Sequence, residues 1–453
     1  MNLDFKTRPI FLIGALGSGM SSLAQIFLDY GANVYGQDAK ENDLKKGLEA
    51  KGMKFINSLK ELYDKEFSVC VYSSAIDKQT NEYYQHFSKT NSILMHRSKA
   101  LHEIFKEKKT ISVAGSHGKT STTTMIAEIL EKSNREPSFM IGGEPGFSDG
   151  IGGRYSLGEF AVYESDESDG TFLNHDADYK VLTNIDNDHL DYYKNREGLN
   201  EAFSKYLENP NSKKLVCLDD LGIQELLKEN KFENIRFYSS KVKKQELEEI
   251  VSFQILNSKI EFSFQNKIYL FSMPYPGNHY LKNALAAILT TELLGVPIET
   301  SISILENYSG VKRRFEFLGE NLGIKVFDDY GHHPTEIEAV IHSVHSLNKK
   351  AAIIFQPHRF TRTRDLYLEF AKSLSLADKI FLLPIYSAGE KPIEGINTEL
   401  ISKEIPKLTF QLTGEITKDM QTVRNELTSD FILVSLGAGN VREWGNYFLK
   451  EKT

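Results

Sequence analysis

The sequence predicts an α/β protein organised in three domains. Short apolar runs alternate with longer segments in which apolar residues recur at helical spacing, and this alternation is typical of parallel sheets covered by helices. The chain has 453 residues, which is enough for two to four domains of ordinary size. The alternation falls into three blocks, and we expect domains at residues 1–105, 106–310 and 311–453.

The first block opens with a strand, a glycine-rich turn and a helix. The turn, Gly14 to Gly19, is similar to a dinucleotide-binding pattern except that Leu16 occupies the place of its second glycine. Asp38 follows Gly17 by about 20 residues, the spacing of a ribose-binding acid. We therefore expect a Rossmann-like domain that binds a nucleotide diphosphate, not NAD specifically. The expected strands span residues 9–13, 33–36 and 67–72, and the helix spans residues 20–30.

The second block opens with a candidate phosphate-binding loop. An apolar strand at residues 110–114 leads into Gly115-Ser116-His117-Gly118-Lys119-Thr120, and a helix is expected at 121–132. Glycines let a backbone close on phosphates, and a helix N-terminus presents free N–H groups to an anion. Lys119 would reach the terminal phosphates, and the Thr120 hydroxyl would ligate Mg²⁺. The strict phosphate-loop pattern has a glycine where this chain has Val113, so the match is to the shorter G-x-x-G-K-T.

Acidic residues follow the next two strands of this block. The strand at 159–164 ends in Glu164, which Asp166, Glu167 and Asp169 follow closely. Carboxylates at the carboxyl end of a parallel strand suit a hard cation beside a phosphate loop. The strand at 180–184 leads to His189, which three aspartates accompany, and either the histidine or one of these acids is a candidate metal ligand. Mg²⁺ prefers oxygen, so a nitrogen ligand would indicate Mn²⁺ tolerance or an indirect contact.

The rest of the chain is predicted to hold antiparallel hairpins, a long helix and a third α/β block. The third block carries histidines and arginines after two of its strands, in Asp328 to Pro334 and in Gln356 to Asp365. Such a cationic surface suits carboxylate or phosphate recognition, because arginine binds these groups with two parallel hydrogen bonds. The hairpins are expected at 250–271, the helix at 278–294, and the strands of the third block at 324–327, 351–355, 379–383 and 431–436.

Composition limits the partners and the compartment. The net charge is −8 and the pI about 5.9, which argues against nucleic acid as a partner. Cys70 and Cys217 both lie in apolar runs, so we expect buried thiols in a reducing compartment. No apolar run approaches the roughly 20 residues that span a bilayer. We therefore expect a cytoplasmic protein, monomer or homodimer, with no membrane partner.

Taken together, these segments resemble the Mur ligase family over nearly the whole chain. The resemblance rests on the loops at 14–20 and 115–120, on Glu164 to Gly170, on Asn184 to His189, on Pro276 to Asn283, and on the third-block segments at 329–334, 358–365 and 437–439. It implies three domains, which bind a UDP-substrate, hold ATP, and close over the site. It also implies that L-alanine is joined to the lactyl carboxylate of UDP-N-acetylmuramate while ATP is cleaved to ADP and phosphate, in the synthesis of peptidoglycan precursors.

The resemblance also assigns roles to matching positions. It implies a catalytic group of Lys119, His332, Arg359 and Arg362, and metal ligands Thr120, Glu164 and His189. ATP would be bound by Gly115, Ser116, His117, Gly118, Lys119, Thr120, Ser121, His279, Asn283 and Arg314. The sugar nucleotide and the amino acid would be bound by Gly17, Gly19, Ser73, Ser74, His117, Tyr330 and His332. The chain departs from the family at Leu16, where a glycine is usual, and at Tyr280, where asparagine is common.

Three other functions are compatible with parts of this pattern. A murein-tripeptide recycling ligase would use the same sugar nucleotide, and the runs at Glu164 to Gly170 and Asp329 to Pro334 favour the alanine-adding enzyme over it. A nucleotide-binding switch or regulatory ATPase would not need the arginine-rich third block. A nicotinamide-dependent dehydrogenase would rest on the first glycine loop alone, whose spacing is broken.

Overall fold

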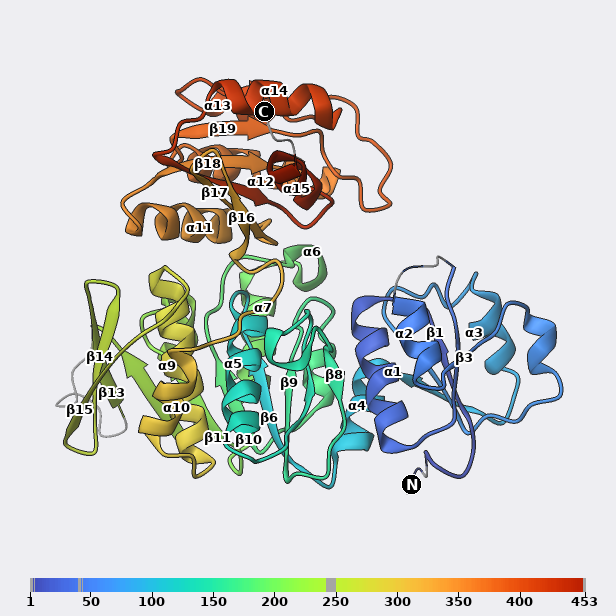
Figure 1. Cartoon of the computed structure of the whole chain (residues 1–453). Helices are drawn as coiled ribbons and strands as arrows, with labels where there is room; N and C mark the ends of the chain where they lie inside the picture. Colours follow the sequence, from blue (N-terminus) through green and yellow to red (C-terminus); the bar gives the residue numbers. More distant parts are fainter. Residues whose placement is uncertain (1–2, 4, 40–41, 43, 242–249, 451–453) are drawn as a thin grey trace. The chain divides into compact units, whose positions relative to one another are not determined.

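The computed structural model describes residue 3, residues 5–39, residue 42 and residues 44–241 and 250–450. By its internal contacts the chain forms two compact units. The first unit comprises Met1–Phe271 and Lys282–Ser309, and the second comprises Ser272–Leu281 and Gly310–Thr453. Figure 1 labels the elements of both units.

The first unit begins with a five-stranded parallel sheet in the order β3-β2-β1-β4-β5. Its central strand β1 leads directly through the glycine loop into α1, so the loop lies at the carboxyl end of the sheet. The strands are β1 (Ile10–Ile13), β2 (Val34–Gln37), β3 (Lys54–Phe55), β4 (Val69–Tyr72) and β5 (Ile93–His96). The helices are α1 (Ser18–Tyr30), α2 (Leu44–Ala50), η1 (Leu59–Leu62), α3 (Glu82–Phe87) and α4 (Arg97–Phe105).

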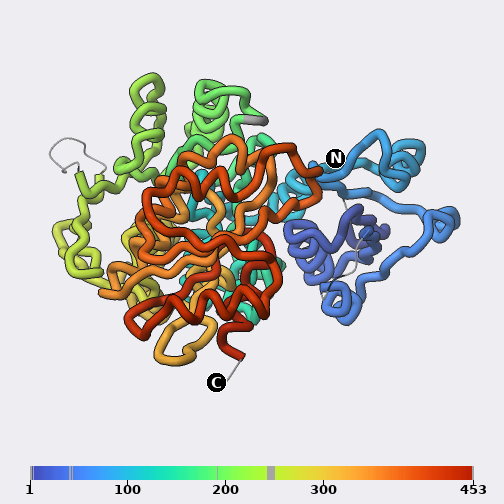
Figure 2. Tube along the Cα trace, turned by 90° about the horizontal axis from the view of Figure 1, so that it is seen from above, coloured from blue at the N-terminus to red at the C-terminus, as the bar shows by residue number. Residues whose placement is uncertain are grey.

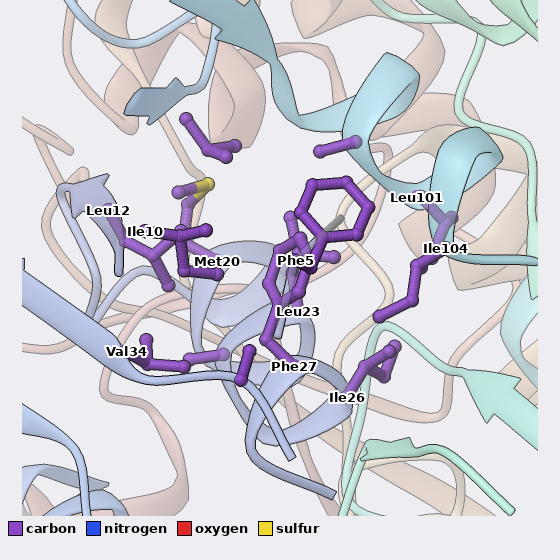
Figure 3. Close-up of a cluster of buried hydrophobic side chains, with 14 of the residues drawn as sticks. Phe5, Ile10, Leu12, Met20, Leu23, Ile26, Phe27, Val34, Leu101 and Ile104 are labelled. Carbon is purple, nitrogen blue, oxygen red and sulfur yellow. The ribbon is translucent and has the colours of Figure 1, made fainter. Parts of the chain in front are cut away.

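One face of α1 forms the centre of this region's core. Met20, Leu23 and Phe27 recur at helical spacing and are buried, together with Leu12 of β1. Figure 3 shows these side chains converging with Phe5. Leu16, which interrupts the expected glycine pattern, is buried in the same cluster. Its side chain therefore helps to pack the loop onto the sheet.

The first unit continues into a ten-stranded sheet in the order β15-β14-β13-β12-β11-β10-β6-β9-β7-β8. Strand β6 lies between β9 and β10 and is parallel to both. The carboxyl ends of these three strands therefore meet at one edge of the sheet, where ligands gather in α/β proteins. The strands are β6 (Lys109–Ala114), β7 (Ser138–Met140), β8 (Gly153–Arg154), β9 (Phe160–Glu164), β10 (Tyr179–Leu182), β11 (Lys213–Cys217), β12 (Ile235–Ser239), β13 (Ile250–Leu256), β14 (Lys259–Phe264) and β15 (Lys267–Ser272).

Helices follow most strands of this sheet, and α5 continues directly from β6 (Figure 1). They are α5 (Lys119–Lys132), η2 (Gly146–Ser148), η3 (Thr171–Asn174), α6 (Leu190–Tyr193), α7 (Arg196–Leu207), α8 (Leu221–Glu229), α9 (Asn278–Leu293) and α10 (Ile298–Leu305).

The second unit contains a six-stranded sheet in the order β16-β17-β21-β18-β19-β20. Its strands are parallel except for the edge strand β16, which is antiparallel to β17. Figure 2 follows this part of the trace in orange and red. The elements are β16 (Glu316–Asn321), β17 (Ile324–Asp329), α11 (Pro334–Ser346), β18 (Lys350–Phe355), α12 (Phe360–Leu374), β19 (Lys379–Leu382), α13 (Glu399–Glu404), β20 (Phe410–Gln411), α14 (Ile416–Asn425), β21 (Phe431–Leu436) and α15 (Arg442–Lys450).

The α/β class and the major strands predicted from sequence are confirmed, with small differences at their ends. The helix expected at 121–132 begins earlier, at Lys119, because its first turn is polar and carries no apolar periodicity. The strand expected at 180–184 ends at Leu182. Cys70 and Cys217 are buried free thiols, as expected. In the part of the chain that the structure describes, no helix has the length and apolar character needed to span a membrane.

Candidate active site

The loop between β6 and α5 is shaped by two glycines with positive φ. Gly115 has φ +133°, and a Cβ there would lie 2.2 Å from Oγ1 of Thr183. Gly118 has φ +82°, and a Cβ there would lie 2.9 Å from Oδ1 of Asn283. A side chain at either position would therefore collide with its neighbour and strain the backbone. The glycines make the tight loop possible.

The end of the adjacent strand β10 holds this loop in place. The backbone N–H of His117 donates to Oδ1 of Asn184 at 2.8 Å, and Nδ2 of Asn184 donates to the His117 carbonyl at 2.8 Å. The His117 imidazole also contacts Asp186, with 3.0 Å between Nε2 and Oδ2. Ser116 Oγ accepts the N–H of Asp186 at 2.8 Å. These four contacts fix the conformation of the loop in this structure.

Lys119 points back over the loop to a buried carboxylate. Its Nζ donates to the Gly115 carbonyl at 2.6 Å and to both carboxylate oxygens of Glu167 at 2.8 Å. The Glu167 side chain is 1% exposed and that of Lys119 is 15% exposed. Burial opposes the charge of Lys119, but the carboxylates of Glu167 and Asp166 raise its pKa above the ordinary value. The ammonium is therefore charged and is held over the loop by these contacts.

Thr120 and Glu164 form an oxygen-rich pair beside Lys119. The Thr120 hydroxyl donates to Oε2 of Glu164 at 3.1 Å, and the backbone N–H of Gly142 donates to Oε1 at 2.6 Å. A hydroxyl and a carboxylate are the donors that Mg²⁺ prefers, so these residues fit that ion. His189, the third expected ligand, lies near a different acid, with Nε2 3.9 Å from Oε1 of Glu167.

Two further residues of the expected ATP group lie at this loop. Ser121 is buried in the first turn of α5. Asn283, on α9, is also buried, and its amide lies against Gly118. The chain thus brings Asn283 to the phosphate loop from a point far along the sequence.

The expected sugar-nucleotide residues lie around the first glycine loop and the end of β4. Gly17 is the N-cap of α1, and Asp38 accepts the Leu16 N–H at 2.8 Å. Ser73 follows β4 and its carbonyl accepts the Ile76 N–H at 3.1 Å. The carboxylate of Asp38 therefore holds the glycine loop in this structure.

Ser74 connects β4 with the acidic segment that follows β9. Its hydroxyl donates to Oδ2 of Asp169 and lies 3.0 Å from Nε2 of His96. Asp169 belongs to the same segment as Glu164 and Glu167, which contact the phosphate loop. The segment from 164 to 169 therefore contacts both candidate nucleotide sites of the first unit.

Tyr330, His332 and His358 form an aromatic cluster after β17 and β18. The His332 ring centroid lies 5.4 Å from that of Tyr330 and 5.7 Å from that of His358. The Arg314 guanidinium lies 5.3 Å from the Tyr330 ring centroid. Burial lowers the pKa of His332 to about 4, and the nearby Arg362 charge also lowers it, while Glu336 opposes the shift. His332 is therefore neutral at pH 7.

Arg359 and His279 are also positioned within the second unit. Nε of Arg359 donates to Oε1 of Glu390 at 2.6 Å, and Arg359 has φ +74°. Non-glycine residues with positive φ cluster at functional sites because the strain must be maintained by surrounding contacts. Burial lowers the pKa of His279 to about 4. The second unit thus holds neutral imidazoles together with charged guanidinium groups.

Two of the residues that these contacts identify could not be distinguished in the sequence. Glu167 is one of four acids after β9 and had no separate role, although it is the partner of Lys119. Glu390, the partner of Arg359, had no motif of its own. The feature that could have favoured Glu167 is its position three residues after Glu164, which allows both to approach one loop.

The chain is similar to known protein families, curated sequences and solved structures. Three family descriptions match in order: "Mur ligase family, catalytic domain" over residues 9–109, "Mur ligase middle domain" over 113–291, and "Mur ligase, glutamate ligase domain" over 313–439. The UDP-N-acetylmuramate–L-alanine ligase of Dictyoglomus turgidum is 38% identical, covering 98% of this chain and 97% of that protein. The ligase of the same name from Aquifex aeolicus is 36% identical, covering 98% of each.

Solved structures share the fold at lower sequence identity. The UDP-N-acetylmuramate–alanine ligase of Thermotoga maritima superposes with a TM-score of 0.79 at 24% identity, covering 98% of both chains. A murein peptide ligase from Psychrobacter arcticus superposes with a TM-score of 0.69 at 22% identity, also covering 98% of both.

The fold and these matches define the protein as an ATP-dependent ligase. The identity to curated relatives extends along almost the entire chain, so it is not confined to the nucleotide-binding region. The chain belongs to the Mur ligase family.

Proposed function

We propose that this protein joins L-alanine to the lactyl carboxylate of UDP-N-acetylmuramate, with cleavage of ATP to ADP and phosphate, in the synthesis of peptidoglycan precursors. The observation that carries the proposal is the similarity to UDP-N-acetylmuramate–L-alanine ligases, at 34–38% identity over nearly the full length. The phosphate loop with its ordered Lys119 supports the same chemistry.

The chemistry explains why a phosphate loop and a separate substrate site are both needed. A carboxylate is a poor acyl donor at neutral pH, because its leaving group would be an oxide. Transfer of the γ-phosphoryl group of ATP to the lactyl carboxylate gives an acyl phosphate and ADP. The amine of L-alanine then attacks the acyl carbon, phosphate leaves, and an amide forms. The negative charge that develops in these steps needs fixed cations.

Lys119 is the cation that we assign to the transferred phosphoryl group. In this structure its ammonium is bound by Glu167 and by loop carbonyls. ATP phosphates at the loop would compete with Glu167 for the same N–H donors. Because Glu167 lies beside the loop, Lys119 needs to move only a short way between the two partners. Glu167 thus keeps Lys119 ordered and charged in the absence of nucleotide.

We assign Mg²⁺ to Thr120 and Glu164, whose hydroxyl and carboxylate oxygens already approach each other at 3.1 Å. His189 is the third proposed ligand, through Nε2. When bound, Mg²⁺ would neutralise phosphate charge and orient the phosphates. The chain's own contribution is to hold Glu164 in place through the Gly142 N–H.

We assign amino-acid binding and transition-state stabilisation to the second unit. His332, Arg359 and Arg362 would hold the acyl phosphate and the incoming amino acid, and Tyr330 would shape the pocket. His332 is neutral at pH 7, so its imidazole can both donate and accept a hydrogen bond in this pocket. We also propose that the enzyme acts in the cytoplasm, a reducing compartment that fits its buried free thiols, and that it is a monomer or homodimer.

Phosphate release tests the proposal. The purified protein is incubated with ATP and Mg²⁺ and with UDP-N-acetylmuramate, L-alanine, both or neither, and the product is analysed by mass spectrometry. We expect release that requires both substrates and a product that gains one alanine residue. Replacing L-alanine by the murein tripeptide distinguishes the recycling ligase, which would prefer the tripeptide. Release that ignores both substrates would contradict the proposal.

A further inference from the structure

Arg97 lies directly over the first glycine loop. It is the first residue of α4, and its Nη1 lies 2.2 Å from the position that a Cβ on Gly19 would occupy. The guanidinium therefore occupies the space that any side chain at position 19 would need. Gly19 is the last residue of the glycine loop that we assign to the sugar nucleotide, and it lies in the first turn of α1.

Arg97 forms a long ion pair with the carboxylate of Asp166. Nη2 of Arg97 lies 3.5 Å from Oδ2 of Asp166, and the two side chains are 24% and 44% exposed. Oδ1 of Asp166 accepts the Ser168 N–H at 3.1 Å, which fixes the carboxylate. An ion pair at this distance, with both groups reaching solvent, is weak and is easily exchanged for a better partner.

The same segment links Arg97 to the phosphate loop. Asp166 precedes Glu167, which binds Lys119 with both oxygens. Burial raises the pKa of Asp166, but its carboxylate is close enough to both Lys119 and Arg97 for each charge to lower that pKa. Arg97 thus lies against the glycine loop at Gly19 and shares an acidic neighbour with Lys119 of the phosphate loop. Its planar guanidinium is suited to bind a phosphate or a carboxylate with two parallel hydrogen bonds.

We propose that Arg97 binds an oxyanion of the sugar nucleotide, and that it leaves Asp166 when this substrate binds. The inference rests on the proposed function, which supplies a substrate with a diphosphate and a lactyl carboxylate. Either group offers the paired oxygens that Arg97 can take. Before the substrate binds, Asp166 keeps the guanidinium charge paired beside the glycine loop, as Glu167 does for the ammonium of Lys119. Arg97 is thereby assigned as a substrate-binding residue at the junction of the two candidate nucleotide sites in the first unit.

Calorimetric titration of the full-length protein tests this assignment. Wild type, Arg97→Met, Arg97→Lys and Lys99→Met are titrated with UDP-N-acetylmuramate. Lys99 is exposed on the same helix, so its substitution removes an equal charge without touching the loop. We expect Arg97→Met to weaken binding by about tenfold or more, Arg97→Lys to retain part of the affinity, and Lys99→Met to bind like wild type.

Two other ligands identify which oxyanion is bound. UDP carries only the diphosphate, and UDP-N-acetylglucosamine has the diphosphate and the sugar without the lactyl carboxylate. If Arg97 holds the diphosphate, Arg97→Met weakens all three ligands alike. If it holds the carboxylate, the loss is confined to UDP-N-acetylmuramate. Either pattern supports the proposal, and unchanged affinity for all three ligands overturns it.

Steady-state kinetics separate binding from a merely structural role. For Arg97→Met we expect a raised KM for UDP-N-acetylmuramate and an unchanged KM for ATP. If Arg97→Met instead raises both KM values equally and lowers the melting temperature, and Arg97→Lys does not restore that temperature, Arg97 serves the fold. That result would overturn the proposal. Failure of the proposed function is distinct: wild type would then bind sugar nucleotides without forming the alanyl product. Wild type that binds no sugar nucleotide would overturn both.

Discussion

Removing the ammonium of Lys119 should destabilise the protein as well as inactivate it. The Glu167 carboxylate is 1% exposed and binds Nζ of Lys119 with both oxygens at 2.8 Å. Lys119→Met removes both of these hydrogen bonds and the charge that balances the buried carboxylate. Leaving a buried charge without its partner typically costs about 3–5 kcal/mol. Because the Lys119 side chain is 15% exposed, we expect the free energy of unfolding to fall by an amount near the lower end of this range, about 3 kcal/mol.

Differential scanning calorimetry of nucleotide-free variants measures this loss. A cost of about 3 kcal/mol corresponds to a fall of about 6 °C in the transition of the first unit. The double variant Lys119→Met/Glu167→Gln removes both charges and should recover more than half of that fall, while phosphate release stays abolished. The matched control is Lys205→Met, which breaks an exposed pair with Glu201 and should leave the melting temperature nearly unchanged.

Two results would refute this reasoning. A melting temperature for Lys119→Met equal to that of wild type would show that the ion pair contributes nothing to the nucleotide-free state. A double variant no more stable than the single variant would show that the loss does not come from the unpaired carboxylate of Glu167.

Three other perturbations follow from the same contacts. Glu164→Gln should raise the Mg²⁺ concentration for half-maximal phosphate release by about tenfold or more, because a neutral amide attracts the cation less; an unchanged requirement would remove Glu164 from the metal site. Asn283→Ala should raise the KM for ATP about tenfold and leave the KM for the sugar nucleotide unchanged, as initial rates would show. Burial raises the pKa of Asp329 from 3.8 to about 6. Its contribution to stability is therefore full below pH 4 and is lost as pH rises through about 6. Melting temperatures of wild type and Asp329→Asn should diverge over that range, and parallel pH profiles would contradict the shift.

The phosphate loop was predictable because its features are local. Gly115 and Gly118 adopt backbone conformations that other residues avoid, and Lys119 and Thr120 follow in the same turn. The alternation of strands and helices likewise gave the α/β class, since buried parallel strands are short apolar runs. The start of α5 was placed late because polar residues fill its first turn.

Contacts between distant segments could not be obtained from the pattern. Glu167 is one of four acids within six residues, and only the path of the chain after β9 turns it toward Lys119. Arg97 is a single arginine at the start of a helix, and its contact with Gly19 depends on the sheet order that brings α1 and α4 together. The packing of Asn283 against Gly118 likewise depends on where α9 lies.

The boundaries expected at 105 and 310 stay a prediction. The family matches fall at 9–109, 113–291 and 313–439. The contacts within the chain instead group the first two of these regions into one compact unit, and they assign Ser272–Leu281 to the second. The first two regions form one unit because apolar side chains pack across the expected boundary at 105. Ala161 and Tyr163 of β9 belong to the same core cluster as α1.

The central claim is that ATP activates the lactyl carboxylate, and an isotope measurement tests it most directly. UDP-N-acetylmuramate labelled with ¹⁸O in that carboxylate is turned over with ATP, Mg²⁺ and L-alanine, and the released phosphate is analysed by mass spectrometry. If an acyl phosphate forms and is attacked by the amine, one labelled oxygen leaves with the phosphate. Unlabelled phosphate would show that ATP is hydrolysed by water, and would contradict the account.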